Sequence, residues 1–213
     1  MKLKNNLTLD NILESIQSSY EQKFSEIQIQ VLIEGYNEGV EIQAYADPSI
    51  PYHVMRSIHH ALSEFGNPND CEVFKEKIVK YLYDGYDVNQ IDELAKGMLG
   101  DVDESLYARK SFNSLKMYTI RTNLERNVNV LPYVRQKFEI AQINEIAEGL
   151  YLGLNVSCYA SKDFTAQQMR LIRIGLEEGL DAAQYADPSL SEMEMFFKLD
   201  ELRHPIVIGG SHL

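Results

Sequence analysis

The chain has 213 residues, of which 45% are hydrophobic, and a formal net charge of -12. This length is sufficient to bury the core of one domain, and the negative charge argues against a general affinity for nucleic acid. Because the sequence shows no membrane-length apolar run, no signal-peptide-like start and only the two cysteines Cys71 and Cys158, we expect a cytoplasmic protein without a membrane span.

The first clear helix signal lies at Ser25, which stands three residues before Gln28 in the spacing of a capping box. The segment YADPSI (45–50) follows it and returns almost letter for letter as YADPSL (185–190). Similar residues recur every 26 positions over most of the chain, and such a period predicts stacked supersecondary units. The recurring positions are a tyrosine column (Tyr107, Tyr133, Tyr159, Tyr185), a glycine column (Gly35, Ala61, Gly97, Asn123, Gly149, Gly175) and an Asp/Asn column (Glu41, Asp103, Asn129, Asn155, Asp181).

The period slips once, between Ala61 and Tyr86. FGNPND (65–70) has the composition of a loop, and CEVFKEKIVKYLYDG (71–85) is predicted to be an extra helix without the tyrosine turn. One interpretation is a joint between two sub-arrays near residues 66–71. Because no flexible linker composition appears there, we favour a single helical repeat domain over residues 1–213.

A cationic band follows the extra helix. Residues 105–138 carry 7 basic and 1 acidic residues, whereas residues 1–104 have a net charge of -11 and residues 139–213 a net charge of -7. The band either balances the acidic ends as a solvated face or forms a docking site for an acidic partner or a nucleic-acid backbone. Its candidate partner-binding residues are Arg109, Lys110, Lys116, Arg121, Arg126, Arg135 and Lys137.

One complete repeat is TAQQMRLIRIGLEEGLDAAQYADPSL (165–190). Thr165 and Gln168 have capping-box spacing, so a long helix is expected to start there. Gly179 suits the left-handed residue after the helix, and Leu180 can then fold back in a Schellman cap. Asp181 is expected to cap a second, very short helix. Each unit thus supplies one long and one short helix.

The columns have structural and functional interpretations. The tyrosines could form an aromatic ladder for nucleobases or peptide, but we favour buried rings whose hydroxyls reach backbone groups. Each mid-helix glycine costs about 1 kcal/mol relative to alanine, which predicts that a neighbouring helix approaches closely there. We interpret the Asp/Asn column as helix N-caps rather than a row of ligands.

No motif for catalysis or metal binding is apparent. The five histidines form no cluster with metal spacing, and His59 and His60 are interpreted as a surface pair. DVDES (101–105) lacks the later Gly and Glu of a calcium loop, and nothing near Cys158 would lower its pKa. We therefore predict no catalytic residue, no metal site and no cofactor.

The segment QMRLIRIGLEEGLDAAQYADPSL, with its earlier copies, resembles a repeat of about 26 residues in uncharacterised proteins from phages, plasmids and integrative elements of Firmicutes. That repeat has the pattern QM-x-EIR-x-GLE-x-GLDVS-x-YADP-x-F. The likeness runs from about Ser25 to Leu202, is close over residues 142–190 and is weak around residues 61–86. The resemblance implies a mobile-element context, in which small acidic proteins often inhibit host defence, and it implies no catalytic residues.

We predict an all-α helical repeat solenoid, with residues 204–213 as a C-terminal tail outside the repeat. The favoured function is a non-enzymatic protein-binding module, and one form of it is a mobile-element inhibitor of a bacterial defence nuclease, such as an anti-CRISPR protein. A nucleic-acid-binding protein that uses the basic band at residues 109–137 is the first alternative. An enzyme whose site is assembled from distant repeats is the second.

Overall fold

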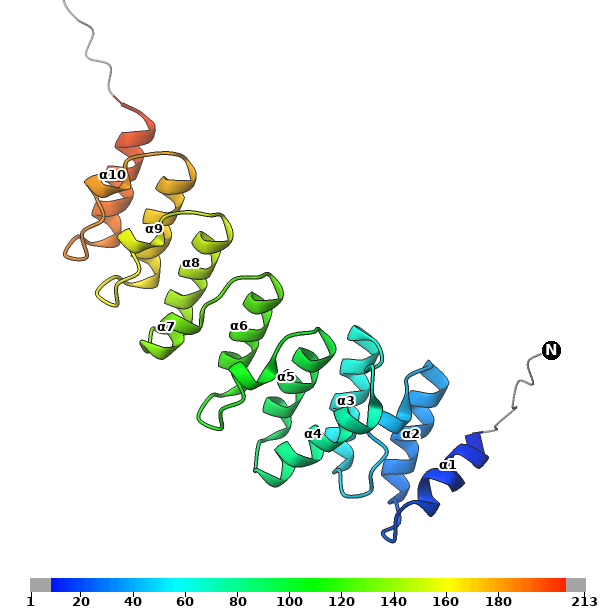
Figure 1. Ribbon diagram of the computed structural model, residues 1–213. Helices are drawn as coiled ribbons and strands as arrows, with labels where there is room; N and C mark the ends of the chain where they lie inside the picture. Colours follow the sequence, from blue (N-terminus) through cyan, green and yellow to red (C-terminus); the bar gives the residue numbers. More distant parts are fainter. Residues whose placement is uncertain (1–8, 206–213) are drawn as a thin grey trace, which may run out of the picture. The chain divides into compact units, whose positions relative to one another are not determined.

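The computed structural model describes residues 9–205, and every regular element in that range is helical (Figure 1). The expected all-α class is therefore confirmed for the described part of the chain. The α-helices are α1 (Leu9–Ser18), α2 (Glu26–Glu38), α3 (Tyr52–Phe65), α4 (Cys71–Tyr83), α5 (Val88–Leu99), α6 (Ser114–Glu125), α7 (Leu131–Arg135), α8 (Ile140–Tyr151), α9 (Ala166–Glu177) and α10 (Glu192–Arg203). The short 3-10 helices are η1 (Ile42–Ala44), η2 (Glu104–Leu106), η3 (Val156–Cys158) and η4 (Ala182–Gln184).

The chain divides into two compact units between Arg121 and Thr122, inside α6. This division differs from the joint expected near residues 66–71, which is a loop within the first unit. Of the expected tail at 204–213, residues 206–213 lie outside the described range.

In the first unit, α3 packs against both α2 and α5, and α4 packs against η1 and α5 (Figure 1). The expected extra helix is thus confirmed as α4, which buries Phe74 and Ile78. Glu104 of η2 accepts hydrogen bonds from Lys77 Nζ at 2.8 Å and Tyr81 Oη at 3.2 Å. The helix α4 thus contacts both η1 and η2. It lies where a further 3-10 helix would lie between them in a regular array.

In the second unit, α9 packs against α8 and α10 (Figure 1). The buried residues of these helices are mainly aliphatic, including Ile143, Ile146, Met169, Ile172 and Met195. They recur three or four residues apart, which is the spacing of one helix face. The helices therefore share a core that a single one could not enclose.

A buried glutamine ties each regular repeat together. In α2, α5, α8 and α9, the third residue of the helix is Gln, and its side chain completes a capping box. The amide nitrogen of Gln168 also donates to the carbonyls of Pro188 at 3.3 Å and Leu190 at 2.7 Å, so the start of the helix is fixed to the turn that ends the same repeat. The same tie joins Gln28 to Pro48 and Ile50, Gln90 to Lys110 and Phe112, and Gln142 to Phe164.

The glycine and tyrosine columns meet inside each of these repeats. Tyr185 is 1% exposed, and its hydroxyl donates to the carbonyl of Leu171 at 3.1 Å, directly against Gly175. Tyr107 and Tyr159 have the same arrangement with Gly97 and Gly149. The buried-ring interpretation is confirmed for these three tyrosines. The tyrosine hydroxyl is the closest group to each of these glycines. The expected neighbouring helix is close only in part: a Cβ at Gly175 would lie 3.4 Å from Leu199 of α10.

The helix ends confirm most of the local expectations. Gly179 has a left-handed φ of 71°, and the Leu180 N–H donates to the Gly175 carbonyl at 2.8 Å, which completes the Schellman cap. Asp103 and Asn155 accept capping hydrogen bonds from Ser105 and Ser157. Asp181 occupies the N-cap position of η4 as expected, but its carboxylate accepts a hydrogen bond from the Gln184 side chain at 3.2 Å and none from a backbone N–H.

Tyr45 provides a test of the hydroxyl bonds, because its own buried hydroxyl has no hydrogen-bond partner. An unsatisfied buried hydroxyl costs about 1–3 kcal/mol, whereas a made bond contributes about 1 kcal/mol. We expect Tyr45→Phe to leave stability unchanged or to raise it, and Tyr107→Phe to lower it by about 1–2 kcal/mol. Urea denaturation of both variants measures the difference. Equal losses of stability would show that Tyr45 is hydrogen-bonded after all.

Candidate interaction surface

The basic band is exposed at most of its predicted positions. In the first unit, Arg109 and Lys110 are exposed and Lys116 is half-buried. In the second unit, the exposed members are Arg126, Arg135 and Lys137. The band residues thus belong to two separate units of the structure.

Arg121 does not belong to this surface. It is only 4% exposed, and its Nε donates to Glu93 Oε2 at 2.9 Å. Its guanidinium carbon also lies 5.6 Å from the ring centre of Phe65 and 5.5 Å from that of Tyr118. The prediction that Arg121 contacts a partner is corrected, because the helix turns this residue toward α5.

Arg126 is exposed, but its guanidinium already contacts two other side chains. Its Nη2 lies 3.0 Å from Glu148 Oε2, and its guanidinium carbon lies 3.9 Å from the ring centre of Tyr151. An exposed ion pair of this kind contributes about 0.2–1 kcal/mol. A partner would have to compete with both contacts for Arg126.

We name one group of these residues the Phe112 cluster; it consists of Arg109, Lys110, Phe112 and Lys116. The Arg109 guanidinium carbon lies 5.7 Å from the half-buried ring of Phe112, and Lys116 Nζ lies 5.3 Å from it. Both distances fall in the range of cation–π contacts. Gln90 of α5 fixes the backbone of the cluster through the carbonyls of Lys110 and Phe112, at 3.2 and 2.6 Å.

Several other described cations are paired between or along helices. Arg56 pairs with Glu34, Lys96 with Asp92, Arg173 with Glu145 and Arg203 with Glu178. By contrast, the three cations of the Phe112 cluster make no ion pair with the described residues. No Asp or Glu occurs between residues 105 and 121 to neutralise them. The cluster therefore presents uncompensated positive charge.

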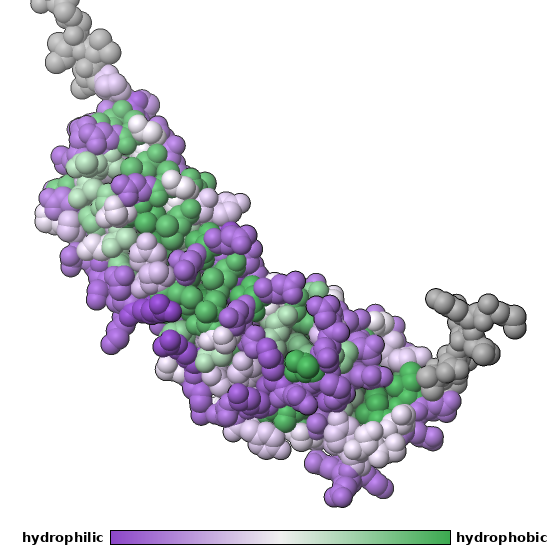
Figure 2. Space-filling model, in the orientation of Figure 1, coloured by the Kyte–Doolittle hydropathy of each residue, from purple (hydrophilic) through white to green (hydrophobic). Residues whose placement is uncertain are grey.

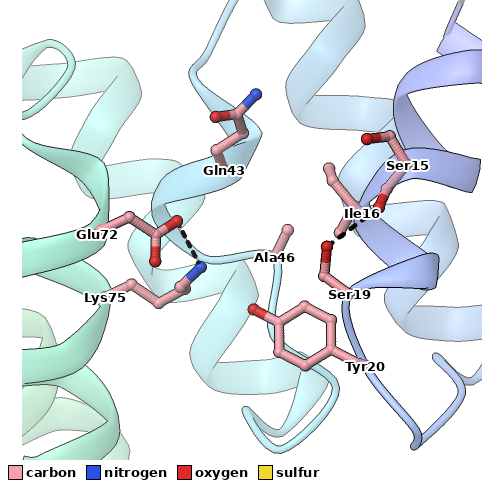
Figure 3. A pocket seen from close by; sticks show the side chains of 8 residues that line it. All are labelled: Ser15, Ile16, Ser19, Tyr20, Gln43, Ala46, Glu72 and Lys75. Atoms are coloured by element: carbon pink, nitrogen blue, oxygen red, sulfur yellow. Dashed lines mark hydrogen bonds and ion pairs between the residues drawn. The ribbon is translucent and has the colours of Figure 1, made fainter.

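A polar cavity of about 420 Å³ lies elsewhere in the first unit, among α1, η1 and α4 (Figure 3). Ser15, Ser19 and Tyr20 face it from one side and Glu72 and Lys75 from the other (Figure 3). Lys75 Nζ lies 3.0 Å from Glu72 Oε1. Burial lowers the pKa of Lys75, but the interactions with Glu72 and Tyr20 together outweigh it and the net pKa is raised, so the ammonium stays charged. Sequence reasoning missed this cavity because its walls come from three segments with no shared motif.

An apolar patch is exposed on α10. Met193, Phe196 and Phe197 are 62%, 45% and 57% exposed, and the two phenylalanine rings lie 6.0 Å apart. Figure 2 shows hydrophobic residues interrupting the hydrophilic surface in the region of the C-terminal helices. Sequence reasoning also missed this patch, because apolar residues at this spacing are typical of a buried helix face.

No group of three or more His, Cys, Asp or Glu that could hold a metal ion occurs within residues 9–205. His59 is 8% exposed, and its Nε2 lies 3.0 Å from Glu38 Oε2, so the expected surface pair of histidines was wrong for this member. Burial raises the pKa of the Cys158 thiol. No described helix combines the length and the apolar character needed to cross a bilayer.

Comparisons with protein-family models, with curated proteins and with solved structures found no match. The resemblance to repeats from mobile elements therefore stays a prediction.

Proposed function

We propose that the chain is a helical repeat solenoid that binds another protein and performs no chemistry on it. In such arrays each repeat packs on its neighbours, and the successive outer helix faces form an extended binding surface. In agreement with this proposal, the buried positions of the repeats keep the same residues, whereas an outer position varies.

The observation that supports this proposal most strongly is a contrast between constant and variable positions. The helices α2, α5, α8 and α9 keep the same tying Gln, the same Gly and the same Tyr in the following turn. One exposed or half-buried position on the long helices changes in chemistry from repeat to repeat. It is occupied in turn by Gln30, Arg56, Asp92, Tyr118, Asn144, Arg170 and Phe196. A fixed scaffold with a varied outer row is typical of repeat proteins that recognise a partner.

A narrower form of the proposal is that the partner is a bacterial defence nuclease. It rests on the resemblance to mobile-element repeats and on the net charge of -12, which could imitate a nucleic acid in a basic groove. Adding the purified chain to cleavage reactions of candidate nucleases tests it. Undiminished cleavage by every enzyme that the chain binds would count against this form.

Affinity capture from bacterial lysate, followed by mass spectrometry and by reconstitution with the purified partner, tests the general proposal. We expect a stable protein complex that survives nuclease treatment. If the complex disappears on nuclease treatment, the nucleic-acid-binding alternative through residues 109–137 is favoured instead. If no protein is retained above a tag-only control, the proposed function is contradicted.

A further inference from the structure

We propose that the Phe112 cluster binds an acidic protein segment that also carries apolar side chains. This inference rests on the proposed function and specifies both the surface and the chemistry of the partner.

The cluster retains its positive charge in strongly acidic surroundings. Residues 1–104 have a net charge of -11, so carboxylates that could neutralise a cation are abundant. Arg109, Lys110 and Lys116 nevertheless make no ion pair within the described part of the chain, whereas Arg121 is buried against Glu93. An unpaired set of cations at a fixed site favours an anionic group supplied from outside.

Lys116 is the most informative member, because it replaces a structural residue. It stands 26 residues after Gln90 and 26 before Gln142, at the position of the tying Gln in α2, α5, α8 and α9. Its repeat also has Asn123 in the glycine column and α7 in place of a 3-10 helix. A lysine at that position gives up the glutamine tie and supplies a cation beside the Phe112 ring. Loss of a stabilising residue in favour of an unpaired charge points to a role in binding.

The surface beside the cluster selects for more than charge. Leu115 and Tyr118 of α6 are 56% and 49% exposed and lie one helical turn apart. Lys116 lies between them in sequence, so apolar and cationic groups share the first turns of α6. A segment that alternates carboxylates with Leu or Phe would complement both kinds of group.

A protein segment fits this surface better than a nucleic acid does. The cations of the cluster span only residues 109–116, and the sequence before residue 105 is strongly acidic. A polynucleotide carries a phosphate at every step, and phosphates that extend from the cluster toward residues 1–104 would be repelled within a Debye length of about 8–10 Å. A short peptide can confine its carboxylates to the cluster.

The test uses a fluorescein-labelled peptide in which Glu alternates with Leu and Phe, with oligothymidylate as the competing probe. We expect the full-length chain to bind the peptide at low salt, and Lys116→Gln and Arg109→Gln each to weaken binding roughly five- to tenfold. Lys116→Gln introduces the residue that α2, α5, α8 and α9 carry at this position, so it should fold normally, which a circular-dichroism melt checks. Lys162→Gln, in the loop before α9, is the matched control, because Lys162 is also exposed and makes no ion pair with the described residues.

The proposal is overturned if the wild-type chain does not bind the peptide, if Lys162→Gln weakens binding as much as Lys116→Gln, or if oligothymidylate binds more tightly than the peptide. Affinity capture can also yield a protein partner. If the Lys116→Gln and Arg109→Gln variants bind that partner as tightly as the wild-type chain does, the Phe112 cluster is not the binding surface, while the proposed function stands. If capture yields no partner, the proposed function itself fails.

Discussion

Gly175→Ala should destabilise the chain by roughly 2–4 kcal/mol, although alanine is the better helix former by about 1 kcal/mol. A methyl group at this position would overlap the hydroxyl of Tyr185 and lie 3.1 Å from its ring carbon Cζ. Tyr185 cannot swing away, because it is 1% exposed and hydrogen-bonded to the carbonyl of Leu171. Urea denaturation followed by circular dichroism measures the loss.

The double variant Gly175→Ala with Tyr185→Phe identifies the obstacle. Removing the hydroxyl relieves the closest overlap, so the double variant should be more stable than Gly175→Ala alone. Gln167→Ala, at an exposed site of the same helix, should change stability by less than about 0.5 kcal/mol. A Gly175→Ala chain as stable as wild type would contradict the close approach of Tyr185, and an unrescued double variant would assign the clash to another group.

The features that were predictable from the sequence depend on partners a few residues apart. The capping boxes expected at Ser25 and Thr165 both form, and Asp87 and Ser191 form the same box, because each needs only a residue three positions later. The Schellman cap at Gly179 is local in the same way. Such contacts follow from the chain's own geometry and require no knowledge of the tertiary packing.

The interpretation of the columns was less complete. The sequence shows that Gly175 and Tyr185 each recur at a period of 26, but a period does not reveal which columns touch. The glycine was therefore assigned to helix–helix packing, whereas a tyrosine of the same repeat fills the space. The tie from Gln168 to Pro188 and Leu190 was missed for the same reason, because it joins residues 20 and 22 positions apart.

The candidate surface was partly predictable. A charge count locates the basic band, but it weighs each arginine alike and cannot say which side of a helix each one takes. Arg109 and Arg121 both contributed to the band, although one is exposed and the other is buried. The apolar stripe of α6 includes Met117 and Ile120, and Arg121 lies beside them on the inner side of the helix. Helix geometry contained this information once the inner side was known.

Arg121→Met should destabilise the chain by about 3–5 kcal/mol near pH 7, because it leaves Glu93 buried without its counter-charge. The two side chains are 5% and 10% exposed, and Nε lies 2.9 Å from Oε2. Arg126→Met is the matched control. Its pair with Glu148 has side chains 41% and 39% exposed, so its loss should cost no more than about 1 kcal/mol.

The pH dependence of Arg121→Met has a definite sign. Burial raises the pKa of Glu93 above its ordinary value, and Arg121 opposes that shift. Without Arg121 the pKa of Glu93 should rise further, so the folded state binds the proton more tightly than the unfolded state. The stability of the variant, compared with wild type at the same pH, should therefore increase as the pH falls through the folded pKa of Glu93 toward its unfolded value near 4.3.

Urea denaturation near pH 7 and near pH 5 tests this, together with the double variant Arg121→Met, Glu93→Gln, which removes the buried charge and should recover much of the loss at either pH. A loss of stability that is the same at both pH values and is not recovered by Glu93→Gln would show that Arg121 acts by packing on Phe65 and Tyr118 instead of by charge. Either result shows that a substitution at Arg121 is unsuitable for locating the partner-binding surface. Arg121→Glu would place a second carboxylate beside Glu93 in the core, so a loss of partner binding in that variant would report unfolding. The binding surface therefore has to be mapped at Arg109, Lys110 and Lys116.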